Sequence, residues 1–112
     1  MRKRCSAIIG PDLAAKALQL SGEDAWEPAS CREVISKLRD SGLAVVGVEL
    51  WNPQGSDAKW IASSNYNCPE SSGWPAYVRC CAEHALAFVD RFGDEPEALF
   101  NLSWSAETET GA

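Results

Sequence analysis

The hydrophobic pattern of the chain changes between a helical period and a strand period. Segment 30–42, SCREVISKLRDSG, has the 3.6-residue spacing of an amphipathic helix. Its apolar stripe consists of Val34, Ile35 and Leu38. Ser30 and Glu33 can form a capping box at its start, and Gly42 stands where a glycine commonly follows a helix. The pattern therefore predicts a well-delimited helix.

Two further helices are predicted on either side of it. Segment 12–20, DLAAKALQL, is rich in helix formers, with Asp12 placed to cap it. Segment 21–29, SGEDAWEPA, is expected to be an acidic loop. The longest helix is predicted at 74–93, WPAYVRCCAEHALAFVDRFG. Its apolar stripe consists of Trp74, Val78, Cys81, Ala85, Phe88, Val89 and Phe92.

Strand patterns occupy the regions between and after these helices. Segment 43–51, LAVVGVELW, is rich in β-branched residues, and 58–64, AKWIASS, follows it across the turn-forming residues 52–57. A third strand is predicted at 97–105. In the first strand the residues expected on the buried face are Ala44, Val46, Val48 and Leu50.

Together these elements predict a single α+β domain over residues 1–112. We expect helices packed on a small, mainly antiparallel sheet, made of a hairpin at 43–64 and a strand at 97–105. The two ends, 1–10 and 106–112, are expected to be flexible.

The charge balance narrows the classes of partner. Sixteen acidic residues against ten basic ones give a formal net charge of −6. Such a surface repels phosphate backbones and attracts basic proteins, so we expect no nucleic-acid partner. No apolar run approaches the length of about 20 residues that a membrane span needs, so we expect no membrane partner and a cytoplasmic protein.

The sequence CCAEH at 80–84 is the strongest candidate for thiol chemistry. Cys81 falls within the apolar stripe of the predicted helix, whereas Cys80 and His84 lie on its flank, one turn apart. A nucleophilic cysteine needs an oriented base and a setting that lowers its pKa, which an acidic helix does not supply. The pattern favours a packed helix, and a Cys–His thiol enzyme is the alternative.

A metal site has little support from the cysteine spacing. Structural zinc needs about four ligands, usually in two closely spaced pairs. The remaining cysteines are isolated: Cys5, Cys31 and Cys68. Five is also an odd number, and no spacing suggests a disulfide framework, so we expect reduced, mostly buried thiols. We expect no catalytic residue, no metal and no cofactor.

Five tryptophans in 112 residues are the unusual feature of the composition. Two fit the predicted core, Trp74 and Trp104. The other three either pack over the sheet and its loops or bind a partner. The second interpretation follows from the enrichment of tryptophan in interface hot spots. Trp26 is our preferred anchor because carboxylates surround it in the sequence. The candidate partner-binding residues are Glu23, Asp24, Trp26, Glu27, Trp51 and Trp60.

Residues 42–105 resemble a known family of bacterial proteins. The order GLAVVGVELW, a turn, KWIASSNYNC, ESSGWPAYVRCCAEHALAFVDRFG and ALFNLSW is similar to the immunity proteins of polymorphic toxin systems, immunity protein 40 type. The matching motifs are Gly47-Val48-Glu49, Asn65-Tyr66, and Trp74 with Tyr77 and Val78. The chain departs from the family pattern at Val46, where a second glycine is expected, and at Cys80, where serine is common.

This resemblance implies a function that composition alone does not. Proteins of this kind bind one cognate toxin C-terminal domain and neutralise it, which protects the producing cell. Many such toxins are nucleases with basic substrate grooves, so a basic nuclease is one partner that an acidic inhibitor would fit. The alternatives are a non-catalytic protein-binding module or regulatory subunit, and the thiol enzyme described above.

Overall fold

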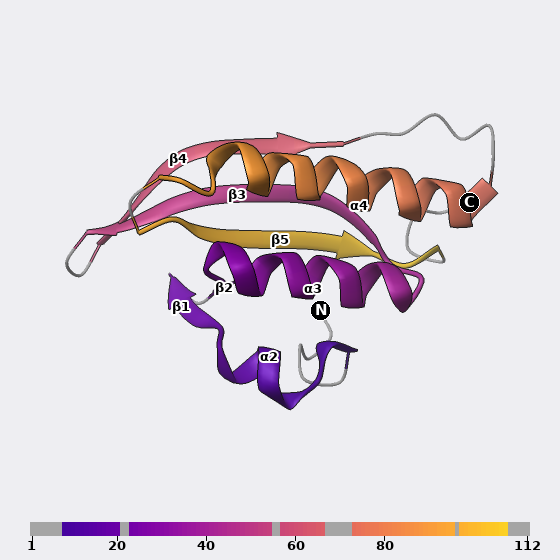
Figure 1. The fold of residues 1–112 in the computed structure, drawn as a ribbon, viewed down its shortest axis with the longest axis horizontal. Coiled ribbons are helices and arrows are strands. Elements are labelled where there is room, and N and C mark those ends of the chain that lie inside the picture. Colours follow the sequence, from indigo (N-terminus) through magenta and orange to yellow (C-terminus); the bar gives the residue numbers. More distant parts are fainter. Residues whose placement is uncertain (1–7, 21–22, 55–56, 67–72, 96, 108–112) are drawn as a thin grey trace.

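Three antiparallel strands form the main sheet, in the order β4-β3-β5. In this computed structural model, which describes residues 8–20, 23–54, 57–66, 73–95 and 97–107, they are β3 (Ala44–Gln54), β4 (Asp57–Asn65) and β5 (Leu99–Ser105). Two helices, α3 (Pro28–Asp40) and α4 (Gly73–Phe92), lie side by side on one face of this sheet (Figure 1). The predicted α+β architecture, with a hairpin and a separate last strand, is confirmed.

The core lies between the sheet and these two helices. The strands contribute Val48, Leu50, Phe100 and Leu102, each at most 1% exposed. The helices contribute the predicted stripe of α3, together with Ala82, Ala85 and Val89 of α4. Phe100 meets Phe88 of α4 edge to face, with ring centroids 6.2 Å apart. Burial of large apolar side chains, at about 1.5–3 kcal/mol each, is the main term that holds the two layers together.

The N-terminal region differs from its prediction. A single helix was expected over 12–20, but α2 (Pro11–Ala15) is short, and strands β1 (Leu18–Leu20) and β2 (Glu23–Ala25) follow it as an antiparallel pair. The prediction of an acidic loop over 21–29 is also wrong, because β2 and the start of α3 occupy most of that segment. Tertiary pairing overrides the local helix propensity, because backbone hydrogen bonds tie the end of β2 to the edge of β5.

Both ends of α3 have a clear local cause. The predicted capping box is wrong, because the helix begins earlier, at Pro28, after Glu27 as N-cap. Proline suits this first position, where its missing N–H would have had no helical partner. The other end is confirmed: Gly42 has a φ of 78°, and Leu43 N–H donates to the Leu38 carbonyl at 2.9 Å.

A β-bulge in β3 changes which valine is buried. Val45 pairs with Trp104 and Gly47 with Ser103, so Val46 is an extra residue in the ladder. Val45 is therefore 1% exposed, whereas Val46, predicted to face the core, is half-buried at the border of the cluster of Ala44, Val78 and Cys81. A one-residue insertion of this kind moves side chains between faces, which simple alternation does not foresee.

The predicted flexible ends lie mostly outside the described residues, at 1–7 and 108–112. Ile9, which belongs to the same N-terminal segment, is buried in the core at 4% exposure. The basic residues Arg2, Lys3 and Arg4 also lie outside the described residues. Within the described ranges, no helix is both long and apolar enough to cross a membrane.

Candidate functional site: the open face of the sheet

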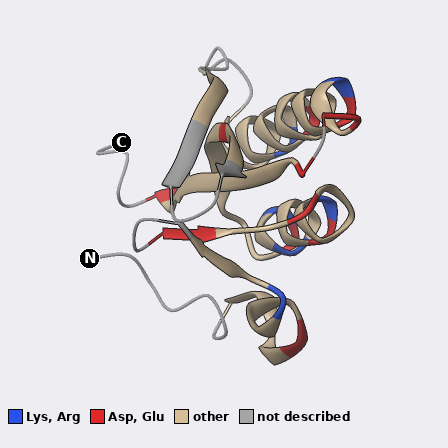
Figure 2. Cartoon of the chain, turned by 90° about the vertical axis from the view of Figure 1, so that its left-hand side faces the viewer, with Lys and Arg blue, Asp and Glu red and all other residues tan. Residues whose placement is uncertain are grey.

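The second face of the sheet is the candidate functional site. Both α3 and α4 pack on the first face, and Figure 2 shows them on one side of the main sheet, with α2 below the strands and no described helix on the other face. Because Val48, Leu50, Phe100 and Leu102 point toward the helices, the residues that alternate with them point away. We call this surface the open face; it consists of Gly47, Glu49, Trp51, Trp60, Ser63, Asn65, Leu99, Asn101 and Ser103.

The strand register arranges the open face in three rows. One row is largely apolar: Leu99, Trp51 and Trp60. The next is polar and acidic: Asn101, Glu49 and Ser63. The third has no bulky side chain on its central strand: Ser103, Gly47 and Asn65. The aromatic row and the acidic row adjoin, because Trp51 and Glu49 are successive residues of the same face, two positions apart on β3.

The two tryptophans differ in exposure. Trp60 lies on the outer strand β4 and is 51% exposed, while its cross-strand partner Trp51 is half-buried on the central strand. A second register shift, between Leu50 and Trp51, leaves Ile61 without a direct partner and brings the two rings to the same face. The predicted candidates Trp51 and Trp60 are therefore neighbours on one surface.

A buried asparagine brings β2 to this surface. The Asn101 side-chain amide donates to the Asp24 carbonyl at 2.8 Å and to Glu23 Oε1 at 3.4 Å. Asn101 is 7% exposed, and it is the buried polar residue among those the structure describes. Because Asn101 pairs directly with Glu49, the carboxylates of Glu23 and Glu49 lie on either side of it. Glu23, a predicted binding residue, therefore lies at the same surface as Trp51 and Trp60, because Asn101 of β5 connects β2 to the open face.

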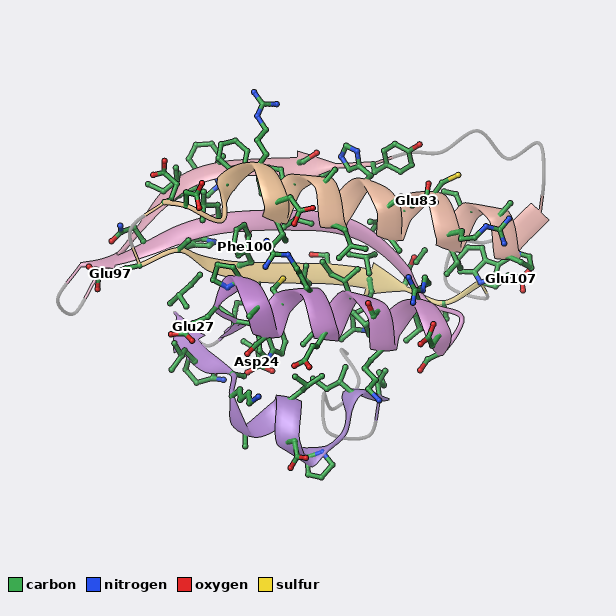
Figure 3. The ribbon with its side chains drawn as sticks, in the orientation of Figure 1. Asp24, Glu27, Glu83, Glu97, Phe100 and Glu107 are labelled. Atoms are coloured by element: carbon green, nitrogen blue, oxygen red, sulfur yellow. The ribbon has the colours of Figure 1, made fainter. Side chains whose placement is uncertain are left out.

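The proposed anchor role of Trp26 is corrected by its burial. Its ring is 1% exposed, and its Nε1–H donates to the Leu13 carbonyl at 3.0 Å. Its backbone exchanges two hydrogen bonds with Phe100, at 2.9 and 2.8 Å. The ring is therefore a core side chain that holds α2 against the sheet. Glu27 is exposed, but it belongs to the start of α3 in the helical layer, where Figure 3 labels it beside Asp24.

Charge is distributed unevenly between the two layers. Every Lys or Arg side chain that the structure describes lies at the end of α2, on α3 or on α4: Lys16, Arg32, Lys37, Arg39, Arg79 and Arg91. Strand β2 contributes Glu23 and Asp24 instead, and strand β3 contributes Glu49. A surface with this bias favours approach by a cationic partner.

The histidine of the CCAEH motif takes part in a contact between α4 and β4. His84 Nε2 and Ser64 Oγ share a hydrogen bond of 2.6 Å, and the Tyr66 ring stacks on the imidazole with centroids 4.4 Å apart. Sequence reasoning missed this contact because its partners are 20 residues apart, on two different elements. A serine–histidine pair is one part of a hydrolase site, which also needs an orienting group and oxyanion donors. Here the contact fastens the outer strand to the helix.

The described thiols are packed in the protein. Cys81 is fully buried, as its place in the apolar stripe predicted, and Cys80 is half-buried. Burial raises the pKa of the Cys31 thiol far above its usual range, and nearby Arg32 lowers it by less. A thiol held in its protonated form is a poor nucleophile. Cys5 and Cys68 lie outside the described residues.

The groove between α2 and α3 lacks the features of a ligand site. A cavity of about 580 Å³ between α2 and α3 is lined by side chains of both charges, among them Asp12, Lys16, Arg32 and Glu33. Because cationic and anionic side chains are interspersed along this cavity, it presents no single charge to a ligand. Within the described residues, no group of three or more His, Cys, Asp or Glu side chains could hold a metal ion.

Comparison with known proteins adds no relative to this description. No protein-family model, no curated protein and no solved structure matches the chain.

Proposed function

We propose that this chain is an immunity protein, which binds a cognate bacterial toxin domain and neutralises it. The resemblance of residues 42–105 to immunity protein 40 supplies the class of partner. The observation that carries the proposal is the open face, because it places a half-exposed tryptophan beside carboxylates on a sheet surface that no described helix covers. Tryptophan is enriched among the side chains that dominate protein–protein binding, which makes the half-exposed Trp60 ring the candidate contact.

Neutralisation by such a protein requires binding and no chemistry. Trp60 would supply a rigid apolar contact, and Glu49 and Glu23 would attract a basic toxin surface. Where the toxin is a nuclease, carboxylates can occupy the place that substrate phosphates would take. This mechanism needs neither the buried thiols nor the histidine contact.

The test is co-expression of this chain with the toxin domain encoded immediately upstream of it. Growth and co-purification are scored together, and the control is the same plasmid with an untranslated copy of this chain. Rescue of growth with a stable complex is the expected result. Absence of rescue would contradict immunity, and a complex without rescue would favour the binding module or regulatory subunit instead.

A further inference from the structure

The open face carries one half-exposed aromatic side chain, Trp60, next to the polar row that contains the Glu49 carboxylate. Among the described residues, the large hydrophobic side chains that are exposed are Trp60, at 51%, and Leu18, at 46%. Trp60 differs from Leu18 in its setting, because it lies in a row with Trp51 and Leu99 on a rigid sheet. Rigid aromatic groups lose little conformational entropy on binding, which suits them as anchors.

Glu49 lies at the centre of this face. It is on the middle strand, between Ser63 and Asn101, and two positions along the strand from Trp51. The described Lys and Arg side chains are in the other layer or at the end of α2. A carboxylate on the central strand, flanked by neutral polar groups and tryptophan, is complementary to a cation that approaches from outside the chain.

We infer that the open face is the docking surface, and that its partner presents a cationic segment that lays a Lys or Arg side chain over the Trp60 ring. The charge of that side chain then lies within reach of the Glu49 carboxylate, one diagonal step across the sheet. Glu23, held beside Asn101, extends the acidic row toward β2. This inference rests on the proposed function, since the partner is the toxin domain.

A second copy of this chain is a poor occupant of the same surface. If two copies met through their open faces, the Glu49 and Glu23 carboxylates of both copies would share one interface, and each chain carries a formal charge of −6. Like charges opposed across an interface cost affinity. The acidic, aromatic surface therefore favours a basic protein over self-association.

The experiment measures the affinity of the purified toxin domain for variants of this chain by titration calorimetry, at low and at high salt. Trp60→Ala is expected to weaken binding by about 30-fold or more, as for a hot-spot tryptophan. Glu49→Gln is expected to weaken it by about tenfold at low salt, with a smaller effect at high salt. The matched control is Glu83→Gln on α4, an exposed carboxylate of the helical layer (Figure 3), which should leave affinity unchanged.

The outcomes separate this inference from the proposed function. If the unmodified chain binds and Trp60→Ala and Glu49→Gln bind equally well, the docking surface is wrong while immunity stands. An effect of Glu83→Gln as large as that of Glu49→Gln would also overturn it, because the helical layer would then be the interface. If the unmodified chain does not bind the toxin domain, both proposals fail. Glu49→Gln removes only a charge, so it tests the surface even where Trp60→Ala folds poorly.

Discussion

The two faces of one three-stranded sheet have opposite characters in this protein. Toward α3 and α4, the central residues of β3 and β5 are fully buried and apolar, as Leu50 and Phe100 illustrate. Toward the open face, the neighbouring residues on the same strands include Glu49, and Trp60 of β4 is half exposed. Adjacent positions on a strand thus belong either to the core or to the surface that we propose for binding, because their side chains point to opposite sides.

Substitutions on the two faces of the sheet should differ most in their effect on the free energy of unfolding. Phe100→Ala should lower the free energy of unfolding by about 3–5 kcal/mol, because it removes a fully buried ring and leaves a cavity. Trp60→Ala removes a larger side chain, yet it should cost only about 1 kcal/mol or less, from the cross-strand pair with Trp51. Urea unfolding of both variants measures the difference, and equal losses would contradict the division.

Trp26 provides a second test of the difference between buried and exposed tryptophans, because the sequence predicted it as the binding anchor and the structure buries it. Trp26→Phe removes the Nε1–H that donates to the buried Leu13 carbonyl, so unfolding should become easier by about 1–3 kcal/mol. Toxin affinity should stay unchanged, because the ring is 1% exposed. Chemical denaturation and calorimetry of the same preparation test both statements. Weaker binding with unaltered stability would restore Trp26 as an anchor.

The buried thiol of Cys31 makes the covered side sensitive to alkaline pH. Burial raises the pKa of this thiol above its ordinary value of 9.0, so above that pH the unfolded chain loses the proton and the folded protein keeps it. The unfolded state then binds fewer protons, and stability falls with rising pH by about 1.4 kcal/mol per unit. Below pH 9 this contribution is fully present.

Comparison with Cys31→Ala isolates that contribution from those of other titrating groups. The variant lacks the thiol, so its unfolding free energy should fall less steeply above the ordinary thiol pKa of 9.0 than that of the unmodified protein. Urea unfolding at several alkaline pH values gives the two slopes. Parallel slopes would mean that the thiol ionises as readily in the folded protein as in the unfolded chain.

The smallest expected effect compares neighbouring serines on opposite sides of β4. Ser64→Ala removes the hydrogen-bond partner of His84 and should cost about 1 kcal/mol. Ser63 is exposed on the open face, so Ser63→Ala should change stability by about 0.5 kcal/mol or less. Thermal unfolding of the pair measures the difference. An equal response would show that the contact between β4 and α4 contributes nothing measurable.

Helices α3 and α4 were predictable from the spacing of their apolar residues, whereas the N-terminal region with α2, β1 and β2 was not. Apolar spacing identified the buried stripe of α3 and the burial of Cys81 in α4, because both depend on a periodicity within one element. The residues after Ala15 have high helix propensity and still form β1 and β2. Their conformation depends on hydrogen bonds between Trp26 and Phe100, which are 74 residues apart, and local propensity carries no information about that pairing.

The sequence predicted only some of the residues that the open face brings together. Acidic residues and spare tryptophans indicated a surface for a basic partner, and Trp51, Trp60 and Glu23 do come to one surface. Glu49 belonged to the motif of the family resemblance but not to the candidate binding residues, because its place beside the tryptophans follows from the strand register. Trp26 was chosen wrongly, because flanking carboxylates in sequence do not imply exposure of the ring between them.

The sequence by itself determined the α+β class, the hairpin, the long amphipathic helix and the acidic charge, since each follows from composition or from a period within one segment. Only the tertiary structure decided which tryptophan is buried, which carboxylate adjoins an exposed ring and where His84 finds its partner. These depend on strand register and on two β-bulges, and a shift of one residue exchanges the two faces of a strand.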